Sequence, residues 1–106
     1  MSYDVSLEIY TGFKNREVLE VGNMTYNIAP MYYLAMGKSL SDFNGKKCAE
    51  LIPILRCGWL DMETKPEKYK KFNPDNGWGN YEVALEFLEK ILDACEYNPL
   101  CTLVVV

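Results

Sequence analysis

The chain has 106 residues, of which 49% are hydrophobic, 13% aromatic and 25% charged, a balance typical of a globular protein and not of a disordered one. This length suits one hydrophobic core, so we expect a single domain over residues 1–106. The formal net charge of −4 argues against direct nucleic-acid binding of the usual basic kind, and a sequence without histidine excludes His-dependent catalysis and most zinc sites.

The N-terminus and the cysteines indicate a cytoplasmic protein. No basic segment followed by an apolar run opens the chain, so no secretory signal is expected. No stretch approaches the roughly 20 apolar residues of a membrane span. The spacing of Cys48, Cys57, Cys95 and Cys101 fits no metal or redox motif. We therefore expect free thiols, with Cys48 and Cys95 buried, and no metal, no cofactor and no membrane.

The first elements in chain order form a predicted hairpin. Residues 3–9 alternate apolar and polar side chains, which is the period of a half-buried strand. Residues 11–16 have the composition of a loop. Residues 18–21 then suit a returning strand that Gly22 and Asn23 would end.

The middle of the chain predicts helices and one long loop. A short helix fits from residue 25 or 27 to residue 36, with Asn27 as its cap, Pro30 in its first turn and Gly37 as its stop. A second helical region runs from residue 44 towards residue 62, and Pro53 predicts a kink or two short helices there. Residues 64–79 are expected to be irregular.

The C-terminal part gives the clearest helix and a terminal strand. Asn80 is a good N-cap, and Asn98 with Pro99 ends the segment. Residues 101–106 are rich in β-branched side chains and predict a strand that pairs with the N-terminal hairpin. The predicted fold is therefore α+β, a small antiparallel or mixed sheet of hairpin and C-terminal strand packed against about three helices.

The last helix carries an acidic stripe on the side opposite its apolar residues. At 100° per residue its members fall within an arc about 80° wide. They are Glu82, Glu86, Glu89, Asp93 and Glu96. One interpretation is a solvated face tempered by the lysines at positions 65, 68, 70 and 71; the other is a surface that imitates nucleic-acid phosphates or docks on a basic protein.

Two clusters of aromatic and amide side chains form a second candidate site. Flat rings beside amides suit the stacking and hydrogen bonding of a ligand, but they also anchor loops and cap helices. The candidate residues are Asn23, Tyr26, Asn27, Tyr32, Trp78, Asn80 and Tyr81. The glycines on both sides of Trp78 indicate a shaped turn, which we expect to tuck the indole inward.

Several short motifs resemble a family of small proteins from tailed bacteriophages and prophages. They lie at residues 3–7, 23–27 with 32–33, 45–46, 50–55, 79–80 and 84–88. The resemblance implies a phage origin, with no catalytic residue carried over. The chain departs from the family at its end, where Pro99 leads into an apolar strand in place of a polar tail.

These observations favour a binding protein over an enzyme, because no catalytic constellation is visible. We expect a cytoplasmic phage accessory protein that inhibits a host defence component, by covering a host protein or by sequestering a small nucleotide signal. A virion structural or assembly protein is the alternative, with self-association through residues 101–106. A small enzyme is the third hypothesis.

Overall fold

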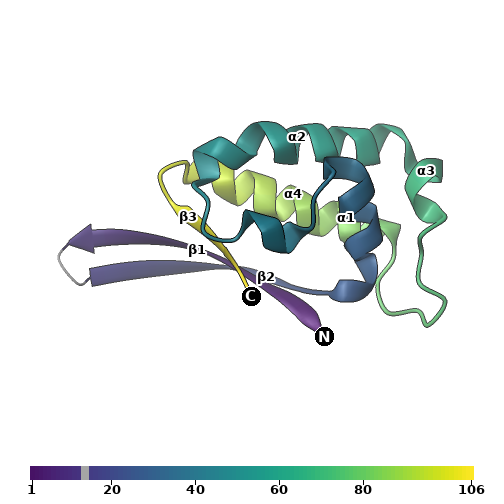
Figure 1. Cartoon of the computed structure of the whole chain (residues 1–106), viewed down its shortest axis with the longest axis horizontal. Coiled ribbons are helices and arrows are strands. Elements are labelled where there is room, and N and C mark those ends of the chain that lie inside the picture. The colour runs from purple at the N-terminus through teal and green to yellow at the C-terminus, as the bar shows by residue number, and fades with distance from the viewer. Residues whose placement is uncertain (13–14) are drawn as a thin grey trace.

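The computed structural model describes residues 1–12 and 15–106, and it confirms the predicted α+β class (Figure 1). Three antiparallel strands form one sheet in the order β2-β1-β3, made by the N-terminal hairpin and the C-terminal strand. The helices cover one face of this sheet, and the hairpin extends beyond them as an arm (Figure 1).

The hairpin is longer than its apolar pattern predicts. Strand β1 spans Ser2–Gly12 and buries Tyr3, Val5 and Leu7 against the helices. Strand β2 spans Asn15–Thr25, so most of the predicted loop at residues 11–16 is strand. The remainder of that loop, Phe13 and Lys14, lies outside the described residues. Cross-strand pairing continues to Gly12 and Asn15, and it replaces the loop that composition alone suggested.

Strand β2 also passes through the two residues that we expected to end it. A register shift lies between the pairs Val5–Gly22 and Ser6–Glu20, and pairing then continues to Thr25. A Cβ atom at Gly22 would lie 3.1 Å from the Phe87 ring, so glycine allows close packing there. Asn23 is held in the ladder by a 2.7 Å hydrogen bond from its Nδ2 to Asp4 Oδ1.

Strand β3, Thr102–Val105, is bonded along both of its edges. One edge pairs with β1, as predicted. On the other edge Gly45 N donates to Leu103 O at 2.8 Å, and Leu103 N donates to Lys46 O at 2.9 Å. The Asn44 side chain accepts from Val105 N at 2.9 Å. Residues 44–46 therefore bond to the outer side of β3, and the prediction of a helix beginning at residue 44 is wrong.

The first helical segment begins at the earlier of its two predicted starts, but its predicted cap is wrong. Thr25 Oγ1 accepts from Asn27 N, so Thr25 and not Asn27 caps the short 3₁₀ helix Tyr26–Ile28. Helix α1, Ala29–Met36, follows and ends at Gly37, whose φ of 72° confirms the predicted stop. A second 3₁₀ helix, Leu40–Phe43, was not predicted.

The remaining helices form the layer over the sheet. Helix α2, Cys48–Thr64, is one continuous helix, so the prediction of two short helices at Pro53 is wrong. Only one backbone hydrogen bond is lost at a proline, and Leu51 and Leu55 are buried on either side of it. Helix α3, Pro66–Lys70, lies within the predicted irregular stretch. Helix α4, Tyr81–Tyr97, matches its prediction, and Asn80 Oδ1 accepts from Val83 N at 2.9 Å.

Between the sheet and the helices lies one core of buried apolar side chains, including Leu7, Tyr32, Leu55, Leu88 and Leu103. Of the helices in the described part of the chain, none has the length and apolar character that crossing a membrane requires.

Candidate functional site

The acidic stripe predicted from the sequence is on the surface. All five of its residues are exposed on α4, while Phe87, Leu88 and Ile91 on the opposite side of the helix are buried. Among the described residues one ion pair reaches the stripe, at 2.8 Å between Arg56 and Glu96. Glu82, Glu86, Glu89 and Asp93 therefore face solvent without a cation within ion-pair distance in the described chain.

The lysines that could have tempered the stripe are engaged elsewhere. Lys65 and Lys68 contact Asp61 at 2.9 and 2.8 Å, and Lys70 lies 3.9 Å from Glu67. Lys65 and Lys68 thus bind a carboxylate of α2, and Lys70 lies near a carboxylate of α3, so none of these three lysines forms an ion pair with the stripe.

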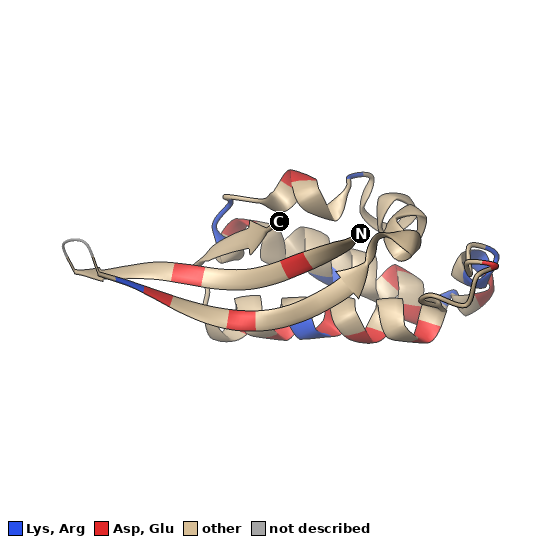
Figure 2. Ribbon diagram, turned by 90° about the horizontal axis from the view of Figure 1, so that it is seen from below, with Lys and Arg blue, Asp and Glu red and all other residues tan. Residues whose placement is uncertain are grey.

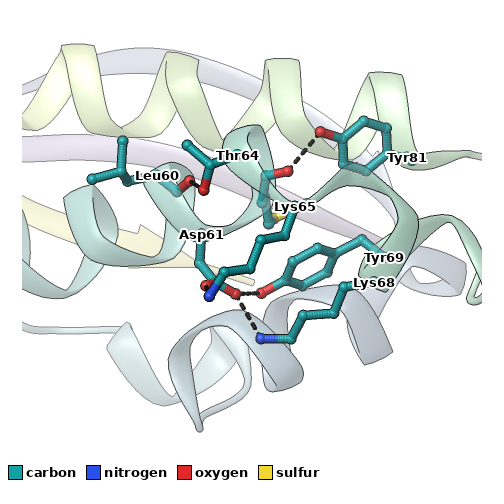
Figure 3. A network of polar contacts seen from close by, with 8 residues as sticks. Leu60, Asp61, Thr64, Lys65, Lys68, Tyr69 and Tyr81 are labelled. Carbon is teal, nitrogen blue, oxygen red and sulfur yellow. Dashed lines mark hydrogen bonds and ion pairs between the residues drawn. The ribbon is translucent and has the colours of Figure 1, made fainter.

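Asp61 is the centre of this lysine network (Figure 3). Hydrogen bonds from Lys68, Tyr69 and Lys65 hold the pKa of Asp61 well below its usual range. Burial, together with the bond to Asp61, raises the pKa of Tyr69. Asp61 is therefore ionised and Tyr69 protonated at neutral pH. The network attaches α3 to the end of α2 and offers no proton-transfer group.

The hairpin also carries exposed carboxylates. Asp4 and Glu20 lie on strands β1 and β2, at positions that alternate with the buried side chains of β1. Figure 2 shows acidic segments along α4 and along both hairpin strands. A hollow of about 200 Å³ where β2 meets α4 is lined by Asn23, Glu86 and Lys90, among others. We call the stripe on α4 the acidic face; Asp4 and Glu20 lie on the face of the sheet that points away from the helices.

The structure divides the predicted aromatic and amide residues into two groups. Tyr32 and Tyr81 are buried and donate hydrogen bonds to Ala84 O at 2.8 Å and Met62 O at 2.6 Å, respectively. Burial raises the pKa of both hydroxyl groups. Asn80 is occupied as the cap of α4. These three residues therefore anchor the core and cap a helix, which is the second of the two interpretations offered by the sequence.

The other four residues come together at one hollow. Asn23, Tyr26, Asn27 and Trp78 line a pocket of about 490 Å³, which we call the Trp78 pocket. Tyr26 is half-buried, with its ring centroid 4.4 Å from that of Tyr3. Trp78 is 70% exposed. The prediction that its indole is tucked inward is therefore wrong.

The packing of the loop backbone accounts for this exposure. Gly77 and Gly79 both have positive φ, 75° and 90°, a conformation that glycine adopts without strain. A Cβ atom at Gly79 would lie 2.8 Å from Thr25 and 2.9 Å from Ile28. The backbone of the loop thus packs closely on the start of the first helical segment, and the indole is left outside.

Sequence reasoning missed two residues of the Trp78 pocket, namely Met1 and Ser2; Met24 and Thr25 lie in the predicted cluster at residues 23–27 but were not singled out. Ser2 pairs with Thr25 in the hairpin, and Met24 lies beside it in β2. Only the strand register places these residues beside Trp78. The signal that could have found them is therefore the pairing of the two strands and not any local motif.

The cysteines show no sign of a reactive site. All four are free thiols; Cys48 and Cys95 are buried as predicted, while Cys57 is exposed and Cys101 half-buried. Burial raises the pKa of Cys48 and Cys95, which disfavours the nucleophilic thiolate. Within residues 1–12 and 15–106, no group of three Cys, Asp or Glu side chains could hold a metal ion.

The C-terminal strand offers little free edge for self-association. Residues 101–105 are bonded to β1 on one side and to residues 44–48 on the other. A groove of about 480 Å³ lies instead where β3 begins, next to Ile9 and Tyr10 of β1 and to Leu100. Oligomerisation stays a prediction, and this groove is a better place for it than the strand itself.

The fold and the surface together define a small α+β protein with an acidic face and one exposed tryptophan pocket. Comparison of the chain with protein-family models, with curated proteins and with solved structures finds no match. The resemblance to phage proteins therefore stays a prediction from the sequence motifs.

Proposed function

We propose that this protein is a phage-encoded cytoplasmic accessory protein that binds a basic surface of a host protein and so inhibits a component of anti-phage defence. The observation that carries this proposal is the acidic face, where four stripe carboxylates lack a cation among the described residues while the nearby lysines bind Asp61 and Glu67. Complementary charge steers partners together and selects among them. The sequence motifs support the phage origin.

Binding is favoured over catalysis by the state of the ionisable groups. The two with the most unusual surroundings are Asp61 and Tyr69: Lys65 and Lys68 neutralise Asp61, and the Tyr69 hydroxyl donates a hydrogen bond to it. The buried thiols are held in their unreactive form. These groups support attachment and packing, and none is poised at neutral pH for general acid or base work.

A basic protein is favoured over a nucleotide signal because of the charge around the pocket. A nucleotide carries phosphates, which need cations or a cluster of N–H donors. Of the residues that the structure describes, neither Lys nor Arg lines the Trp78 pocket. The acidic face next to it would repel phosphates further.

A virion assembly role is the second candidate, because one observation favours self-association. Tyr10 and Leu100 are 68% and 73% exposed beside the groove at the base of the hairpin arm. Exposed apolar side chains around a groove are typical of protein interfaces. Analytical ultracentrifugation at increasing concentration tests self-association, and a monomer throughout would remove the observation that favours this candidate.

The charge proposal is tested with a basic peptide as probe. We expect a decalysine peptide to bind the wild-type protein in isothermal titration calorimetry, more weakly as salt is added. The variant Glu86→Gln/Glu89→Gln/Asp93→Asn should lose most of this binding. A control with the same change in net charge, Glu63→Gln/Glu67→Gln/Asp75→Asn, should keep it. Equal loss in both variants would contradict a localised site.

The biological part is tested in cells. Bacterial hosts that each carry one anti-phage defence system are challenged with a phage that the system restricts. Expression of the wild-type protein should raise the plaque count in at least one host, the stripe variant should not, and the control variant should. No rise in any host of a broad panel would contradict the anti-defence role.

A further inference from the structure

We propose that the Trp78 pocket binds an arginine side chain of the protein partner. This inference rests on the proposed function, since the arginine would belong to the basic surface that the acidic face attracts. It assigns the pocket one chemical class of ligand, a planar guanidinium group.

The first observation is that Trp78 is held in place while its ring is left free. Asn76 Oδ1 accepts a hydrogen bond from Trp78 N at 2.9 Å, and Asn27 Nδ2 donates to Trp78 O at 3.4 Å. Gly77 and Gly79 allow the positive φ that the loop needs on both sides of Trp78, and the backbone of Gly79 packs on Thr25 and Ile28. The backbone is therefore ordered before any ligand arrives, which lowers the entropic cost of binding. An indole that is 70% exposed on such a support presents a flat face for stacking.

The second observation is the pattern of donors and acceptors in the pocket wall. Asn23 Nδ2 donates to Ser2 Oγ at 3.0 Å and to Asp4 Oδ1 at 2.7 Å. Asn27 Nδ2 donates to the Trp78 carbonyl. The side-chain oxygens of both asparagines accept no hydrogen bond from the described residues. The Nδ2 groups of the two asparagines are thus used within the pocket wall, and their Oδ1 atoms stay available to accept hydrogen bonds from a ligand.

These two observations together select arginine. A guanidinium group has five N–H donors and no acceptor, and its plane stacks on an aromatic face. Tryptophan is also the strongest partner in cation–π contacts. The Asp4 carboxylate, bonded to Asn23, adds negative charge close by.

The alternatives fit the same pocket less well. A lysine ammonium group has three donors but no plane that could stack on the indole. An adenine base brings acceptors as well as donors, and its phosphates would find neither Lys nor Arg among the described lining residues. Met1 and Met24, also in the lining, offer apolar surface to the methylene stem of an arginine.

The test follows the indole N–H signals of the two tryptophans by NMR during titration with short peptides. The probe is acetyl-Gly-Arg-Gly-amide, and the control is the same peptide with citrulline, which keeps the shape but lacks the charge. We expect the arginine peptide to shift the Trp78 signal in the millimolar range, with citrulline at least tenfold weaker. Trp59, whose Nε1 is buried, should serve as the unmoved reference.

Two variants assign and challenge the effect. Trp59→Phe should leave the titration unchanged and identify the remaining signal as Trp78. Trp78→Ala should abolish the arginine-dependent shifts of the Asn23 and Asn27 side-chain amides, while the dispersed backbone spectrum shows that the fold is kept. Arginine binding of equal strength in Trp78→Ala would overturn the inference, as would a response of the Trp78 signal to adenosine monophosphate but not to arginine.

The outcome is separable from that of the proposed function. Decalysine binding depends on the stripe and should survive in Trp78→Ala with a loss of less than threefold. If decalysine binds and the arginine peptide does not, the proposed function stands and this inference fails. If the arginine peptide binds at Trp78 and stripe neutralisation leaves decalysine binding unchanged, the pocket is a guanidinium site and the acidic face is not the docking surface.

Discussion

A single glycine positions the candidate site. Gly79 has a φ of 90°, and a Cβ there would lie within 2.9 Å of both Thr25 and Ile28. We expect Gly79→Ala to lower the free energy of unfolding by about 2–4 kcal/mol, from the left-handed backbone and the clash combined. Urea denaturation measures this loss.

The neighbouring glycine is the matched control for that prediction. Gly77 has a similar φ of 75°, but a Cβ atom there would meet no atom of the described chain within 4 Å. Gly77→Ala should therefore cost only the backbone term, about 1–2 kcal/mol. Equal losses in the two variants would show that contact with the first helical segment does not hold the loop.

Asp61 gives the molecule a defined response to acid. Its pKa is lowered in the folded state, mainly by the hydrogen bond from Lys68, so its stabilising contribution is present above pH about 4 and is lost as the pH falls. We expect Asp61→Asn to destabilise the protein by about 1–2 kcal/mol at pH 7. The difference from wild type should shrink by about 1 kcal/mol at pH 3, as urea denaturation at both pH values would show.

Glu63 provides the comparison on the same helix. It is exposed and forms no ion pair with the residues that the structure describes. Glu63→Gln should change the free energy of unfolding by less than about 0.5 kcal/mol at either pH. If the decrease in the free energy of unfolding for Asp61→Asn is the same at pH 7 and pH 3, the Asp61 network stabilises the fold by packing and not by charge.

At the scale of single elements, the cap of α4 is the clearest test. The Asn80 side chain accepts from Val83 N at 2.9 Å, and α4 supplies much of the core. Asn80→Ala should lower the free energy of unfolding by about 1 kcal/mol, and Asn80→Asp should recover it because aspartate caps equally well. Thermal unfolding followed by circular dichroism compares the three proteins. A full loss in Asn80→Asp would indicate that Asn80 acts through the loop and not as a cap.

The elements that could be predicted are those whose signals are local. The alternation in residues 3–9 and the apolar side of α4 both correspond to real elements, as do the stop at Gly37 and the cap at Asn80. The errors occur where a distant segment decides the structure. Gly22 continues a strand because Phe87 packs on it, and residues 44–46 stay outside the helix because they bond to β3. Composition alone cannot show either contact.

The candidate site follows the same rule. The acidic stripe was predictable because a helix places residues by fixed rotation. The Trp78 pocket was predictable only as two separate clusters. The two clusters meet because the loop at residues 73–80 lies next to the open end of the hairpin, at residues 1–2 and 23–27. The outward position of Trp78 could not be predicted, because two glycines of positive φ suit either direction of the side chain.

For the whole molecule, the pattern of charge is a balance between stability and recognition. Glu89 lies three or four positions from Glu86 and from Asp93, and Asp93 lies three positions from Glu96. Like charges at these spacings weaken a helix by about 0.2–0.5 kcal/mol for each pair. We therefore expect Glu89→Gln/Asp93→Asn to raise the free energy of unfolding by about 0.5–1 kcal/mol in low salt.

The gain should depend on salt and on position. It should vanish near 1 M salt, where charges are screened over about 3 Å. The control Glu63→Gln/Asp75→Asn, which changes the net charge equally, should give a smaller gain in chemical denaturation. A loss of stability in Glu89→Gln/Asp93→Asn would mean that these carboxylates stabilise the fold, and the acidic face would need no partner to explain it. If the variant instead gains stability and loses decalysine binding, that result would show that the stripe carboxylates destabilise the fold and are needed for binding.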